Sequence, residues 1–229
     1  MNSKLVYDWP LRVFHWSLVT LFAAAYVVTQ VYDVDEVYFV IHMFCGLTIF
    51  MAILLRICWG VIGEKYSRFS SFALRFSDLI LYFRKVLSGQ EKLWTGHNPA
   101  SSWTALAMGT SALSLALTGY MMTAHDLRAE LGGIHSVLAN VFLALVIGHI
   151  LGVLLHSLRH KDQLAISLIH GKKIICESDS PISNSRPGVA LFFVLFLTAF
   201  AIYAVLHFDG SSGILTLFGS ELHLRMEGV

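Results

Sequence analysis

Long apolar runs alternate with shorter polar stretches along the chain, and five of the runs are long enough to cross a lipid bilayer, which takes about 20 residues in a helix. The pattern predicts membrane-spanning helices over residues 10–31, 37–62, 100–122, 131–158 and 187–206. Asp8 can cap the first helix, and Pro10 suits its first turn. The expected fold is therefore an all-α integral membrane protein.

The composition of the 229-residue chain agrees with this fold, because 56% of the residues are hydrophobic and 14% are charged, whereas soluble domains carry about 25% charged residues. A formal net charge of +1 gives no basic excess, so no nucleic-acid partner is expected. The three cysteines form no CxxCH motif, which argues against covalently attached c-type haem. We interpret them as packing residues.

Basic residues are concentrated in two of the connections between the spans. The positive-inside rule places these connections in the cytoplasm. In a bacterial inner membrane, the N-terminus is then cytoplasmic and the C-terminus periplasmic. The basic residues are Lys65, Arg68, Arg75, Arg84, Lys85 and Lys92 in the first connection, and Arg159, Lys161, Lys172, Lys173 and Arg186 in the second.

The first basic connection contains an amphipathic pattern in the stretch RFSSFALRFSDLILYFRKVLSG. Apolar side chains recur there at intervals of three or four residues, at Phe69, Phe72, Phe76, Leu79, Phe83 and Val86. The pattern predicts a helix near 69–87 that lies on the cytoplasmic membrane surface, in contact with lipid. Docking of this helix on a partner subunit is the alternative interpretation.

Four of the 11 histidines lie well inside predicted spans, namely His15, His42, His135 and His149, whereas His156 lies two residues before the end of its span. His135 and His149 share one helix, on which they project about 40° apart and lie about 21 Å apart along the axis. In the predicted topology, His42 and His135 are near the periplasmic surface, whereas His15 and His149 are nearer the cytoplasm. The depths therefore pair His42 with His135 and His15 with His149.

Two histidines from different helices at one depth can hold a flat cofactor between them. Haem b is the natural candidate because imidazole is a common axial ligand of haem iron, whereas zinc usually takes about four ligands. Two such pairs predict two b haems and an electron path across the membrane. The alternative is a histidine relay in a proton or ion transporter, which predicts acidic partners that the predicted spans lack.

Four motifs carry a resemblance to a known family. RVFHW begins the first span, RICWGVIGEKYSRF closes the second, GHNPASSW opens the third, and GHILGVLLHSLRHKDQLAISLIHGKK ends the fourth. In combination they resemble bacterial cytochromes b561 and the b-type subunits of nickel–iron hydrogenases, over about residues 5–175. The resemblance implies a four-helix core that binds two b haems through the four histidines of the spans. It also implies electron exchange between a membrane quinone and a redox partner.

Further residues are candidates for contacts with these cofactors. Arg12, Arg56 and Arg128 could pair with haem propionates, because a guanidinium matches a carboxylate, although orientation by positive charge explains Arg12 and Arg56 equally well. His97, in the GHNP motif, and His156, seven residues after His149, could contact a propionate or a quinone. No catalytic residue is predicted.

The chain therefore divides into a dihaem core over residues 1–175 and an addition over residues 176–229. The addition contains the fifth span, interpreted as a lipid-facing helix, and a short periplasmic tail in which GILTLF could be a small docking element. The expected redox partner is a periplasmic cytochrome c or a hydrogenase or reductase subunit. A membrane anchor for such a soluble subunit is the remaining alternative function.

Overall fold

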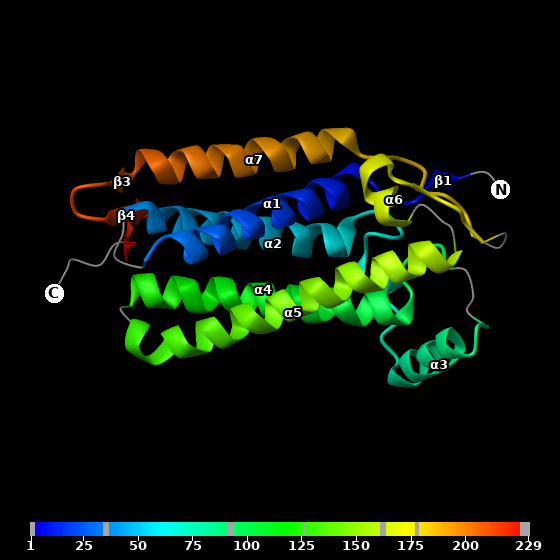
Figure 1. Ribbon diagram of the computed structural model, residues 1–229. Helices are drawn as coiled ribbons and strands as arrows, with labels where there is room; N and C mark the ends of the chain where they lie inside the picture. The colour runs from blue at the N-terminus through cyan, green and yellow to red at the C-terminus, as the bar shows by residue number, and fades with distance from the viewer. Residues whose placement is uncertain are drawn as a thin grey trace. The chain divides into compact units, whose positions relative to one another are not determined.

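The computed structural model describes residues 3–33, 37–90, 94–125, 127–160, 164–176 and 179–224. Within this part of the chain, five helices are long and apolar enough to span a membrane, which confirms the expected all-α membrane fold (Figure 1). They are α1 (Trp9–Val31), α2 (Val40–Ile62), α4 (Pro99–Ala124), α5 (Arg128–His160) and α7 (Pro187–Leu206). The expected boundaries differ from these by a few residues at most.

The other described elements are short. Two further helices are α3 (Phe76–Leu87) and α6 (Leu164–His170), and two 3-10 turns are η1 (Val37–Phe39) and η2 (Phe69–Ser71). Strands β1 (Lys4–Leu5) and β2 (Lys172–Lys173) form an antiparallel pair. Strands β3 (Phe208–Asp209), β4 (Ile214–Leu217) and β5 (Ser220–His223) form an antiparallel meander in the order β3-β4-β5.

The chain forms two compact units, and every long helix contributes a part to each. The basic connections lie in unit 1, whereas unit 2 holds the C-terminal strands. Unit 1 comprises Met1–Val13, Arg56–Thr110 and Leu143–Ala190, and unit 2 comprises Phe14–Leu55, Ser111–Phe142 and Leu191–Val229.

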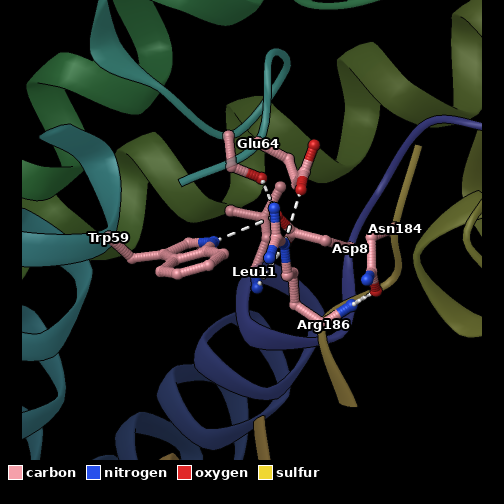
Figure 2. Close-up of polar contacts among 7 residues, drawn as sticks. Asp8, Leu11, Trp59, Glu64, Asn184 and Arg186 are labelled. Carbon is pink, nitrogen blue, oxygen red and sulfur yellow. Dashed lines mark hydrogen bonds and ion pairs between the residues drawn. The ribbon is translucent and has the colours of Figure 1, made fainter. Parts of the chain in front are cut away.

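In unit 1, a fully buried carboxylate fixes the start of α1 (Figure 2). Asp8 accepts a hydrogen bond from the backbone N–H of Leu11 on Oδ1 at 3.0 Å, as an N-cap residue does. Its Oδ2 accepts from Trp59 Nε1 at 3.0 Å and from Ser67 Oγ at 2.8 Å. The predicted cap is therefore confirmed, and it also ties α1 to the end of α2 and the residues after it.

The segment before α7 is fastened to the same region of unit 1. Arg186, which has a positive φ of 53°, forms an ion pair from Nε to Oε1 of Glu64 at 2.6 Å (Figure 2). The hydroxyl of Tyr66 donates to the carbonyl of Ser180 at 2.9 Å. These contacts position the N-terminus of α7 on the connection that follows α2.

The amphipathic helix is shorter than the sequence predicts. Residues 69–71 form η2 and helix α3 begins only at Phe76, because Phe72 and Arg75 have extended backbone conformations. The backbone N–H of Ala73 donates to Ser102 Oγ at 3.0 Å, which holds this extended segment against α4. The prediction of one continuous helix over 69–87 is therefore wrong for its first seven residues.

The C-terminal addition in unit 2 is also more ordered than expected. On α7, Leu197, Phe200 and Ala204 are buried along one face, so this helix does not face lipid on all sides. Leu215 and Leu222, from β4 and β5, are fully buried and pack in one cluster with Phe200 and Ala204. The stretch GILTLF therefore contributes Leu215 and Leu217 to an internal core, which the sequence did not predict, while Phe218 at its end is exposed. Docking by this stretch stays a prediction.

Candidate functional site

Unit 2 brings two of the predicted histidines together. His42 lies in the first turn of α2 and His135 in the second turn of α5. Their ring centroids are 6.2 Å apart and their planes are inclined by 74°. Phe39 stacks on His42 at 5.1 Å, and the aromatic pair of Phe22 and Phe142 packs in the same unit at 4.7 Å. The site thus has two imidazoles, and the ring of Phe39 is stacked on that of His42.

The second nitrogen of each ring is held by a neighbouring helix. Nδ1 of His42 lies 3.0 Å from the backbone carbonyl oxygen of Ala25. A carbonyl oxygen can only accept, so Nδ1 of His42 carries the proton and the lone pair is on Nε2. A hydrogen bond of this kind is the usual way in which proteins orient a metal-binding histidine.

The partner of His135 is a hydroxyl group, which can both donate and accept. Nδ1 of His135 lies 2.8 Å from Oγ1 of Thr118, and the same hydroxyl lies 2.8 Å from the carbonyl oxygen of Ser114. When the Thr118 proton is donated to this carbonyl, Oγ1 accepts from Nδ1 of His135. His42 therefore keeps an Nε2 lone pair that can bind a metal ion, and the contact with Thr118 is compatible with the same tautomer for His135.

The separation of the rings fits a single iron between them. Two metal–imidazole bonds of about 2 Å and two nitrogen-to-centre distances of about 1.1 Å give a centroid distance of about 6.2 Å when the iron and both rings are in line. The observed distance is 6.2 Å. Gly46, one turn after His42, borders open space, because a Cβ atom added there meets nothing within 4 Å. The residues of this site therefore fit a haem with two axial histidines.

The donor set differs from that of a structural metal site. Within the described residues, no group of three or more histidine, cysteine, aspartate or glutamate side chains could hold a metal ion. A bare zinc ion usually takes about four such ligands. A flat macrocycle, which supplies its own equatorial nitrogens, needs only the two axial imidazoles.

The second predicted pair is divided between the units. His15 belongs to unit 2 and His149 to unit 1. The ring of His15 meets the edge of Trp16 at 5.4 Å. His156, one further candidate, also belongs to unit 1. The pairing of His15 with His149 and the contact role of His156 remain predictions.

The arginine contacts differ from those expected. The Nε atom of Arg12 donates to the carbonyl of Leu168 at 3.1 Å, and Nη2 donates to that of Ile169. Its guanidinium also lies 3.7 Å from the ring centroid of Trp9. Arg12 therefore binds the last carbonyls of α6, where a cation is favourable, and these two donors are not directed to a propionate. Arg128, in unit 2, donates to the carbonyl of His223 in β5.

His97 is the other candidate for which the structure gives a clear environment. Its Nδ1 atom is buried and has no hydrogen-bond partner in the described part of the chain. Burial, with the nearby charges of Arg56 and Lys173, lowers the pKa of His97 to about 4. The ring is therefore neutral at physiological pH.

Sequence reasoning missed Thr118 and the Ala25 carbonyl as partners of the paired histidines. Thr118 lies in a span rich in small residues. In such a span, the sequence does not distinguish a threonine that binds a histidine from a small residue that only packs between helices. A backbone carbonyl gives no sequence signal at all. Only the three-dimensional packing of α1 and α4 beside the rings identifies them.

Comparisons with known proteins bear on the whole core. Residues 6–171 match a family model described as prokaryotic cytochrome b561. No curated protein matches the chain, and no solved structure matches it. The matched residues include all four histidines of the predicted spans.

Proposed function

Because the chain belongs to the prokaryotic cytochrome b561 family, we propose that it is a dihaem b-type cytochrome that carries electrons between a membrane quinone and a redox partner. Membership of this family makes it a membrane b-type cytochrome of electron transfer. The proposal goes beyond the family assignment in the number of haems, in the quinone and in the redox partner. The family assignment also favours electron transfer over the alternative of a histidine relay for ion transport.

The observation that carries the proposal is the pair of His42 and His135, with ring centroids 6.2 Å apart. When bound, a haem supplies one-electron redox chemistry. The protein contributes the orientation of the two rings. The Ala25 carbonyl accepts the Nδ1 proton of His42, and Thr118 would accept that of His135, which would leave both Nε2 lone pairs for the iron.

The second haem of the proposal is bound by His15 and His149. Its support is the agreement between two independent features of the sequence, namely the basic connections and the histidine depths. His97 and His156 would contact a propionate or a quinone on the same side. Arg12 is a weaker candidate for such a contact, because two of its donors bind α6.

The proposed setting is a bacterial inner membrane with the N-terminus in the cytoplasm and the C-terminus in the periplasm. The distribution of lysine and arginine supports this orientation. The partner would be a periplasmic cytochrome c or a hydrogenase or reductase subunit, for which the protein could also serve as a membrane anchor. The haem core over residues 1–175 is supported by the extent of the family match, residues 6–171.

A redox titration of the purified full-length protein tests this function. We expect about two b haems per chain, both with the sharp reduced-minus-oxidised bands of six-coordinate iron, and reduction of both by a short-chain quinol. A preparation that holds no haem would contradict the proposal. A preparation with about two redox-active haems per chain that quinol does not reduce would contradict the quinone part of the proposal only.

A further inference from the structure

Two buried nitrogen atoms near the start of α4 have no hydrogen-bond partner among the described residues. They are Nδ1 of His97 and Nε1 of Trp103. Buried polar groups in folded proteins are almost always hydrogen-bonded, and leaving one unpaired is costly. The indole N–H of Trp103 can only donate, so it requires an acceptor.

A short segment of phenylalanines covers this region in unit 1. We define residues 69–76 as the phenylalanine strap. The Phe72 ring lies 4.7 Å from that of His97, and the Phe76 ring meets the edge of Trp103 at 6.4 Å. Phe69 lies under the guanidinium of Arg56, 4.7 Å from its Cζ atom. Each phenylalanine of the strap thus contacts a different polar side chain.

The strap explains why the amphipathic helix begins late. A continuous helix over 69–87 would direct Phe69, Phe72 and Phe76 to one face of a single cylinder. The extended residues before α3, fixed by the bond from Ala73 to Ser102, instead allow the three rings to meet three separate partners. Contact between Phe69 and Gly60 is so close that a Cβ atom at Gly60 would collide with the ring.

The electrostatics of the region favour an oxygen acceptor. Burial first, and then the positive charges of Arg56 and Lys173, lower the pKa of His97 to about 4, so His97 remains neutral beside two cations. A neutral imidazole can carry its proton on Nδ1 and donate it. The strap adds apolar aromatic surface beside these donors, which suits a flat ring with oxygen at its edge.

We propose that His97 Nδ1 and Trp103 Nε1, whose rings contact Phe72 and Phe76 of the phenylalanine strap, are hydrogen-bond donors to oxygen at the edge of a flat apolar ring. This inference rests on the proposed function, because two such groups are part of it, a haem propionate and a quinone carbonyl. It adds Trp103 and the strap, for which the sequence predicted no role in binding. The propionate and the quinone both present an acceptor oxygen, which suits a site that has positive charges and aromatic rings.

The test compares Trp103→Phe and His97→Gln with the control Trp94→Phe in the purified holoprotein. Trp103→Phe keeps an aromatic ring and removes the N–H together with one ring of the indole, a loss of size that the control Trp94→Phe reproduces. It remains informative if His97→Gln fails to assemble. Trp94 lies in the same unit, and its backbone carbonyl, which binds Lys173, is kept in the control. Haem content, midpoint potentials and the dissociation constant of heptyl-hydroxyquinoline N-oxide, a quinone analogue, are measured for each protein.

The two sources of the acceptor give different results. A quinone carbonyl predicts that each variant binds the analogue about 10-fold more weakly, with both haems retained at their normal potentials. A haem propionate predicts that one haem is retained less well and has a lower midpoint potential, because its carboxylate loses a donor. If haem content, potentials and analogue binding all equal those of Trp94→Phe, the proposed site is wrong even though the haems are present.

Discussion

At the scale of single residues, each histidine of the pair has a hydrogen-bonding partner on a neighbouring helix. The carbonyl of Ala25, which can only accept, binds Nδ1 of His42, and the hydroxyl of Thr118 lies at hydrogen-bonding distance from Nδ1 of His135. Such partners are as important as the ligands themselves, since they orient the ring and increase its basicity. The chemistry of the site therefore depends on residues that no histidine pattern identifies.

We predict that Thr118→Val weakens the haem site of His42 and His135. The methyl group cannot accept from His135 Nδ1, and the loss of such a partner typically costs about 10–100-fold in metal affinity. We expect faster haem loss and a higher midpoint potential for one haem. Thr110→Val is the matched control, because Thr110 is on the same helix and its exposed hydroxyl binds only carbonyls of that helix. Equal behaviour of the two variants would exclude this role of Thr118.

We also predict that Asp8→Asn destabilises unit 1. The amide nitrogen cannot accept from Trp59 or Ser67, so buried donors lose their acceptor at a cost of about 1–3 kcal/mol. Thermal unfolding of the holoprotein in detergent would show a lower Tm. Asp209→Asn is the control, because Asp209 binds exposed serines in the turn after β3. An unchanged Tm for Asp8→Asn would mean that the buried cap does not contribute to stability.

At the scale of elements, α3 carries an apolar stripe that remains exposed. Phe76, Ile80, Phe83 and Leu87 lie on one side of the helix, and all four are exposed. The other side faces the protein, where Tyr82 OH accepts from Asn98 Nδ2 at 3.2 Å. Since α3 connects two membrane-spanning helices and has Arg84 and Lys85 in its last turn, the predicted contact with the membrane surface is consistent with these positions.

We predict that a nitroxide at Phe83→Cys, in a chain without native cysteines and reconstituted in anionic lipid, contacts the acyl region. Electron paramagnetic resonance would show greater access of oxygen than of a polar nickel complex. Ser88→Cys, just beyond the helix, should show the opposite preference. Preference for the polar complex at both positions would place the stripe in water or against a weakly bound partner, and so contradict membrane contact.

Predictability from sequence differed between elements for physical reasons. The long helices were found because apolar length is a strong signal, and Asp8 was found because its cap is local. The late start of α3 was missed because it depends on Ser102, which is distant in sequence from Ala73. The β-meander was missed because its apolar residues also suit a loose tail, and only packing on Phe200 and Ala204 orders them.

At the scale of the whole molecule, the direction of the chain in the membrane would determine which of the two proposed haems faces which compartment. The proposed orientation has the basic connections in the cytoplasm. His42, at the start of α2, and His135, near the start of α5, would then lie toward the periplasm, and so would the haem proposed between them.

We predict that a reporter enzyme active only in the cytoplasm functions when inserted after Gly89, in the connection between α3 and α4. A reporter active only in the periplasm should function when fused to the C-terminus. The converse pattern would invert the assignment of both haems to the membrane faces, although it would leave the histidine pairs unchanged.

The most direct test of the central claim is the haem content and redox titration of His42→Ala and His135→Ala, with His125→Ala as the control. We expect each of the first two variants to lose the same haem, identified by its midpoint potential, and to retain the other. The control should retain both haems. If His42→Ala and His135→Ala lose different haems, or if either retains both with unchanged spectra, the two histidines do not share one iron and the account is wrong.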